Sequence, residues 1–112
     1  MEESQKLGIQ TFKGTYCWYP GPTYETPLEI SAFVKLGANL FGMSTVPEVL
    51  AAHSHKMRTV ICSVITNLAA GITKKVLSGS DVVETAARAA EMVEDLFVKL
   101  VNRFNDMPQL AT

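Results

Sequence analysis

The sequence predicts an α/β fold, and two observations support this prediction. Short β-rich or apolar runs at residues 14–19, 39–43 and 58–66 alternate with stretches that carry helix start signals. The third run is β-branched and apolar almost throughout, as expected for a central parallel strand that is covered on both faces. We therefore expect the order β-α-β-α-β-α with parallel strands.

The first strand is expected over residues 14–19, which are rich in β-formers and end at a Pro-Gly-Pro turn. A helix should begin near Pro27, because Thr26 can cap it and Pro suits the first helical position. Glu29 would complete a capping box with Thr26, and Gly37 is a suitable stop.

The second strand is expected over residues 39–43. The following helix carries the same start signal, with Thr45 and Glu48 as a second capping box, and should run to about Lys56. Apolar residues at three- and four-residue spacing then predict one long amphipathic helix over residues 81–104.

The remaining segments are short. Residues 69–80 contain two glycines and are expected to form a loop, and the tail after Asn105 should be frayed. The first residues have the composition of the end of a helix whose beginning is missing. Three strands are few for an independent parallel sheet, so we expect residues 1–112 to be part of one larger domain.

The composition excludes several classes of function. Ten basic and eleven acidic residues give a net charge of −1 without a basic block, so nucleic-acid binding has little support. The sequence has no apolar run of about 20 residues to cross a membrane and no signal peptide at its start. Cys17 and Cys62 are expected to be buried reduced thiols, which suits a cytoplasmic protein, although a disulfide between them stays open.

Three polar pairs follow the three expected strands. They are Tyr24-Glu25, Met43-Ser44 and Thr66-Asn67. Because open parallel sheets bind ligands at the carboxyl ends of their strands, we expect these three turns to form one pocket.

The side chains of these turns suit a planar ring and an anion. Tyr24 offers a flat face, and Glu25 can accept two hydrogen bonds from ring donors. Ser44 precedes a helix start, where backbone N–H groups and the helix dipole favour phosphate. The amide of Asn67 can both donate and accept along a purine edge. Each residue also has a purely structural interpretation, as part of a turn, a cap or a strand end.

A metal site is not expected. His53 and His55 lie two residues apart on a helix and so do not share a face.

The motifs resemble one family. Residues 14–16, 21–26, 42–49 and 65–72 are similar, in the same order and with similar spacing, to the C-terminal part of purine nucleoside phosphorylases of the trimeric, low-molecular-mass type. The resemblance runs from about residue 8 to about residue 104. It implies that residues 1–112 are the C-terminal part of a single phosphorylase/hydrolase-like domain, a three-layer α/β/α fold with a mixed sheet.

The resemblance also implies an activity. Purine nucleoside and phosphate would give free purine base and ribose 1-phosphate, as in purine salvage, with 6-oxopurines preferred. The enzyme would be a cytoplasmic homotrimeric transferase that uses inorganic phosphate as co-substrate and no cofactor. Asn67 favours hypoxanthine and guanine, because relatives specific for 6-aminopurines carry Asp there.

Roles for the site residues follow from the same resemblance. Tyr24 would stack on the base and Glu25 would bind its N1 side, while Asn67 would hydrogen-bond N7 and O6 and stabilise the charge of the leaving purine. Glu25 and Asn67 are thus the expected catalytic residues. The remaining assignments are phosphate binding by Ser44, ribose binding by the Met43 backbone, and pocket walls from Phe41, Thr66 and Val82.

Two departures from the family bear on function. Gly79 stands where relatives commonly carry a His that contacts the ribose 5′-hydroxyl. The N-terminal half, which supplies most of the phosphate site, is not in this sequence. We therefore expect one piece of a split, nicked or truncated phosphorylase that is inactive without that half. The alternatives are a non-catalytic fragment that binds purines weakly or docks on a full-length relative, and a nucleosidase that uses water.

Overall fold

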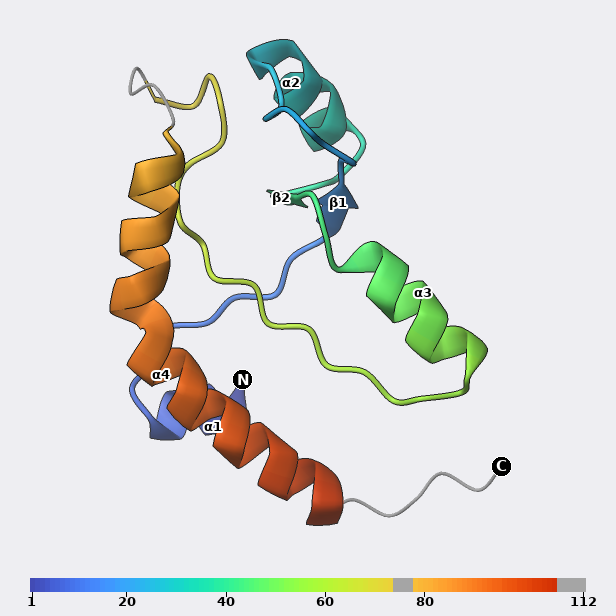
Figure 1. The fold of residues 1–112 in the computed structure, drawn as a ribbon, viewed down its shortest axis with the longest axis vertical. Coiled ribbons are helices and arrows are strands. Elements are labelled where there is room, and N and C mark those ends of the chain that lie inside the picture. The colour runs from blue at the N-terminus through green and yellow to red at the C-terminus, as the bar shows by residue number, and fades with distance from the viewer. Residues whose placement is uncertain (74–77, 107–112) are drawn as a thin grey trace. The chain divides into compact units, whose positions relative to one another are not determined.

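The computed structural model describes residues 1–73 and 78–106 (Figure 1). The chain divides into two compact units, Gly14–Val82 and Met1–Lys13 with the chain from Val83 on. Part of the expected loop at residues 69–80 lies outside the described residues, namely 74–77. The same holds for residues 107–112 of the tail expected to be frayed.

A parallel pair of strands forms the centre of the Gly14–Val82 unit. Strand β1 (Tyr16–Trp18) pairs with β2 (Leu40–Gly42), and Cys17 lies opposite Phe41 in the register. Both strands were predicted, and their parallel direction confirms the α/β class. The described part of the chain contains this two-stranded sheet and not the three-layer mixed sheet that the resemblance implies.

Helix α2 (Pro27–Lys35) forms as predicted. The Thr26 hydroxyl accepts a hydrogen bond from the Glu29 N–H, and the Glu29 carboxylate accepts one from the Thr26 N–H, so the capping box is complete. The helix ends at Lys35 with Leu36 as its C-cap, before Gly37 adopts a positive φ of 97°. Its inner face buries Ile30, which is 2% exposed.

Helix α3 (Val46–Ser54) starts differently from our prediction. Thr45 makes no side-chain cap hydrogen bond, so the expected capping box with Glu48 is wrong. Instead, Thr45 has φ 79° and ψ −51°, and the Val46 N–H donates to the Ser44 carbonyl at 2.9 Å. This geometry is a γ-turn, a strained conformation for a β-branched residue.

The expected strand at residues 58–66 is absent, which corrects the sequence prediction. After α3 the chain runs without helix or strand (Figure 1). Val60 and Ile61 are 52% and 51% exposed. A strand exists only when a neighbouring strand satisfies its backbone groups, and within the described residues no strand pairs with this segment. The composition of the segment suits a buried strand, but composition alone does not form one without a neighbouring strand.

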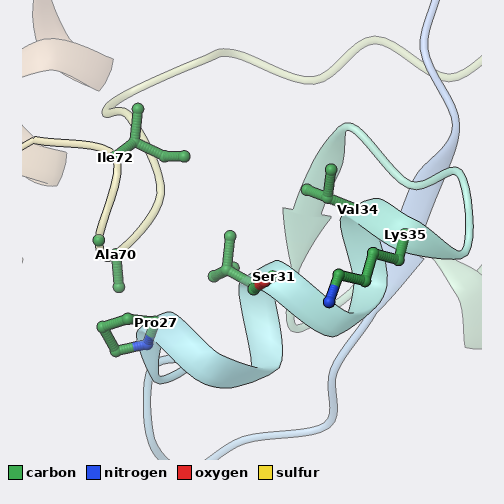
Figure 2. A pocket seen from close by; sticks show the side chains of 8 residues that line it. Pro27, Ser31, Val34, Lys35, Ala70 and Ile72 are labelled. Atoms are coloured by element: carbon green, nitrogen blue, oxygen red, sulfur yellow. The ribbon is translucent and has the colours of Figure 1, made fainter.

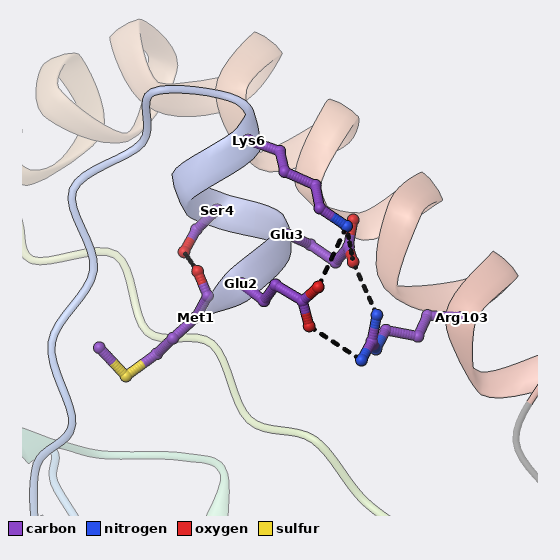
Figure 3. A network of polar contacts seen from close by, with 6 residues as sticks. All are labelled: Met1, Glu2, Glu3, Ser4, Lys6 and Arg103. Carbon is purple, nitrogen blue, oxygen red and sulfur yellow. Dashed lines mark hydrogen bonds and ion pairs between the residues drawn. The ribbon is translucent and has the colours of Figure 1, made fainter.

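The other unit joins the two ends of the described chain. Ion pairs connect helix α1 (Glu2–Lys6) with α4 (Gly79–Asp106), the long helix predicted over 81–104. Arg103 of α4 forms ion pairs with Glu2 at 2.9 Å and Glu3 at 3.0 Å (Figure 3). Hydrogen bonding from Lys6, followed by the charges of Lys6 and Arg103, lowers the pKa of Glu3.

Two further observations bear on the sequence predictions. Within the described residues, no helix is both long and apolar enough to span a membrane. Both cysteines are free thiols, but Cys17 is half-buried and Cys62 is exposed, so neither is buried as expected.

Candidate functional site

The first two candidate turns lie together at the carboxyl ends of β1 and β2. The Trp18 indole Nε1–H donates to the Met43 carbonyl at 3.2 Å, and the Tyr19 N–H donates to the Gly42 carbonyl at 2.9 Å. The Met43 methyl group lies where a side chain at position 21 would stand, so Gly21 permits this contact. The parallel register therefore brings the two turns to one edge, as predicted.

The loop of residues 20–25 carries the two residues expected to bind the base. Tyr24 is 50% exposed, and Glu25 is half-buried. The loop ends at Thr26, the N-cap of α2, so both candidate residues stand directly before a helix start. Both side chains are therefore at least partly open to solvent.

Ser44 lies exposed in the second turn, two residues before α3. Its Oγ is 3.5 Å from Thr45 Oγ1, and its carbonyl accepts the hydrogen bond of the γ-turn. Because Thr45 does not use its hydroxyl as a cap, the hydroxyls of Ser44 and Thr45 both remain beside the helix N-terminus. Hydroxyls and a helix dipole at one point favour an anion.

The third turn is not joined to the other two by a hydrogen bond among the described residues. Thr66 and Asn67 are half-buried, and the Asn67 Nδ2 donates to Thr66 Oγ1 at 2.9 Å. This bond fixes the direction of the amide. It leaves the second N–H and the Oδ1 of Asn67 for other partners.

The segment just after Asn67 packs on the start of α2. A Cβ at Gly71, whose φ is 83°, would lie 2.7 Å from the Cβ of Pro27, so only glycine fits there. A mainly apolar hollow of about 310 Å³ lies beside this contact, between α2 and residues 70–72 (Figure 2). None of the predicted site residues lines it. The contact places Gly71, four residues after Asn67, beside the start of α2.

The two remaining candidates have different surroundings. Phe41 is half-buried in β2, and its ring centroid lies 6.3 Å from that of Phe33 on α2. It therefore packs between sheet and helix. Val82 is half-buried in the first turn of α4.

The sequence analysis missed a hydrogen-bond network behind the 20–25 loop. The Tyr19 hydroxyl donates to Glu29 Oε1 at 2.6 Å. The Thr26 N–H and hydroxyl donate to Glu29 Oε2 at 2.7 and 2.8 Å. The capping-box signal predicted the bonds to Thr26, whereas no local pattern marks a tyrosine ten residues before the glutamate.

These bonds shift two pKa values in opposite directions. Hydrogen bonding from Tyr19, then from Thr26, lowers the pKa of Glu29. The bond to Glu29, followed by the negative charges of Glu29 and Glu25 and by burial, raises the pKa of Tyr19. The network thus favours an ionised Glu29 and a protonated Tyr19.

We expect this network to make stability depend on pH at both extremes. A lowered carboxyl pKa stabilises the fold above the unfolded value of about 4.3, and this contribution is lost as pH falls through the folded value. A raised tyrosine pKa stabilises the fold below about 10, and this contribution is lost as pH rises through the folded value. The stability difference between the chain and Glu29→Ala, measured by urea unfolding, should be constant from about pH 5 to about pH 9. It should shrink toward pH 3, and a constant difference at pH 3 would contradict the network.

A metal centre is not supported by the arrangement. Residues 1–73 and 78–106 contain no group of three or more His, Cys, Asp or Glu side chains that could bind a metal ion together.

The sequence matches the Phosphorylase superfamily over residues 1–102, so the chain belongs to this family. A Mycobacterium tuberculosis relative named purine nucleoside phosphorylase is 43% identical over 103 residues, which cover 92% of this chain. A relative from Moorella thermoacetica named "Probable 6-oxopurine nucleoside phosphorylase" is 35% identical over 90% of this chain. The resemblance to purine nucleoside phosphorylases is confirmed.

A solved structure shows the same fold. The crystal structure of a Schistosoma purine nucleoside phosphorylase in complex with hypoxanthine aligns with 96% of this chain, with a TM-score of 0.87 and 27% sequence identity. The chain spans only 39% of that protein and 38% of the M. tuberculosis relative.

Proposed function

We propose that this chain supplies the base-binding part of a purine nucleoside phosphorylase. The observation that carries the proposal is the meeting of the Tyr24-Glu25 and Met43-Ser44 turns at one edge of parallel strands, through the Trp18–Met43 hydrogen bond. The chain belongs to the phosphorylase superfamily, and its relatives bear the name of this activity.

The reaction would convert a purine nucleoside and phosphate into free base and ribose 1-phosphate. A phosphate oxygen forms a bond to the ribose anomeric carbon while the glycosidic C–N bond breaks, and the electron pair leaves with the purine. The purine anion then takes up the proton that the hydrogen phosphate gives up as it becomes ribose 1-phosphate. Preplaced hydrogen-bond donors lower the barrier because they stabilise this developing charge without reorganisation. Asn67 would donate to the leaving purine, and Glu25 would accept from its N1–H.

The remaining roles are those that the family resemblance implies. Tyr24 would stack on the base, and Ser44 would bind phosphate. The Met43 backbone, whose carbonyl accepts from Trp18, would bind the ribose. Phe41, Thr66 and Val82 would line the pocket. We further propose that the active assembly is a cytoplasmic homotrimer with inorganic phosphate as co-substrate and no cofactor.

The chain would act together with the part of the phosphorylase fold that it lacks. It spans 38% of its M. tuberculosis relative, and residues 59–65 of the expected third strand are exposed and form neither helix nor strand. The missing part would pair with this segment and supply further phosphate-binding groups. It could belong to the same polypeptide or to a separate one, and the chemistry is the same in both cases.

A chimera tests the proposal. The 103-residue stretch of the M. tuberculosis relative that this chain matches would be replaced by the corresponding residues of this chain. We expect the chimera to convert inosine into hypoxanthine and ribose 1-phosphate only when phosphate is present, and the chain alone to be inactive. Hydrolysis to free ribose without phosphate would indicate a nucleosidase. A folded chimera that binds hypoxanthine without turnover would overturn the catalytic proposal.

A further inference from the structure

The side chain of Glu29 joins the two ends of the 20–25 loop. Tyr19 lies immediately before this loop and Thr26 immediately after it, and both donate to the same carboxylate. Oε1 accepts from Tyr19 and Oε2 accepts twice from Thr26. We refer to these three hydrogen bonds as the Glu29 clamp.

The ends of the clamp are themselves fixed. The Tyr19 ring centroid lies 5.9 Å from that of Phe33, and the Tyr19 N–H donates to the Gly42 carbonyl of β2. Thr26 caps α2, whose Ile30 is buried. The clamp therefore ties the loop to the strand on one side and to the helix on the other. The loop between them contains two prolines, which reduce its freedom further.

We propose that Glu29 is a positioning residue for the purine base, because its carboxylate sets the geometry of the loop that carries Tyr24 and Glu25. This inference rests on the proposed function and extends it to a residue that does not touch the substrate. A loop ordered before binding loses less conformational entropy when the base arrives. The clamp should therefore act on substrate affinity more than on the chemical step.

A helix cap alone does not explain the contact with Tyr19. A capping box needs only Thr26 and Glu29, whereas the Tyr19 bond crosses the loop. Tyr19→Phe removes that bond and leaves the capping box and the ring packing. Glu29→Ala removes both the bond to Tyr19 and the capping box. Comparison of the two variants separates loop positioning from capping.

Helix α3 provides a matched control. Glu48 occupies the same third position of its helix as Glu29 does in α2, also near a proline, but α3 has no side-chain cap hydrogen bond. We expect Glu48→Ala to change neither the loop nor the affinity for inosine. The control thus corrects for the loss of a negative charge near a helix start.

The first measurement concerns the loop itself and needs no activity. Amide ¹⁵N order parameters of Thr23, Tyr24 and Glu25 in the full chain should be near about 0.85 and fall toward about 0.6 in Tyr19→Phe and Glu29→Ala. Glu48→Ala should retain the values of the unchanged chain. Unchanged order parameters in Tyr19→Phe would show that the clamp does not order the loop, whatever the protein does.

The second measurement uses the chimera with inosine and phosphate. Because Tyr19 acts on the base only through the loop, loss of its hydrogen bond should raise KM in Tyr19→Phe by about three- to tenfold, the range of an ordinary hydrogen bond, with kcat within about twofold. Equal falls in kcat and kcat/KM, or an unchanged KM despite a mobile loop, would overturn the positioning role. If the unsubstituted chimera showed no phosphorolysis, the proposed function would fail, while the order parameters would still decide whether the clamp exists.

Discussion

Asn67→Ala in the chimera should lower kcat/KM for inosine and guanosine by about 100- to 1000-fold. This is the range observed when one donor to a developing negative charge is removed from an enzyme site. The Asn67 Nδ2 uses one N–H for Thr66 at 2.9 Å, which leaves the second N–H for N7 or O6 of the leaving base. Removal of the amide would leave that charge without its donor. The loss should therefore occur in kcat as well as in kcat/KM.

The substitution Asn67→Asp tests specificity at the same position. An ionised carboxylate has no N–H and cannot donate to O6, whereas it can accept from a 6-amino group. We expect the ratio of kcat/KM for adenosine to that for inosine to rise by at least about tenfold, equivalent to one hydrogen bond. Asn102→Ala, on the exposed surface of α4, serves as the control. An unchanged rate in Asn67→Ala would remove Asn67 from the mechanism.

Local signals predicted those parts of the fold that depend on neighbouring residues. The capping box at the start of α2 forms as expected, because all its bonds join Thr26 and Glu29. The same pattern at Thr45 and Glu48 fails, because the γ-turn from the Ser44 carbonyl to the Val46 N–H holds Thr45 at φ 79° and ψ −51°. The N-cap Thr26 instead has φ −78° and ψ 159°, the extended conformation of a capping residue. Sequence spacing does not distinguish the two cases, since the backbone conformation of the N-cap residue decides whether its side chain can reach the helix.

Of the longer-range contacts in the site, the sequence predicts one and does not predict the other. The meeting of the first two turns followed from the parallel direction of β1 and β2, which the sequence predicts. The bond between Tyr19 and Glu29 depends on how α2 lies against β1, and no sequence pattern encodes that angle. The roles of the predicted site residues stay predictions until the chimera and its variants are measured.

The segment at residues 58–66 should become a strand when the rest of the phosphorylase fold is present. Val60 and Val64 alternate with Ile61 and Ile65, so a strand here would have two apolar faces, as central parallel strands do. All four side chains are exposed in the described structure. A neighbouring strand would satisfy the backbone groups of this segment, and helices packed on both faces of the sheet would bury its side chains.

Hydrogen exchange can follow this transition. In the chimera, amides of residues 60–65 should exchange at least roughly a thousandfold more slowly than in the chain alone, as expected for amides that open only on global unfolding. The matched pair Ile61→Val and Ile61→Asp tests burial at one position. Ile61→Val should preserve protection and activity, because it keeps a β-branched apolar side chain. Ile61→Asp should prevent folding of the chimera, because a buried unpaired charge is strongly destabilising. Equal protection in the chain and the chimera would show that this segment is not a strand in the assembled protein, and the missing part would then have to dock elsewhere.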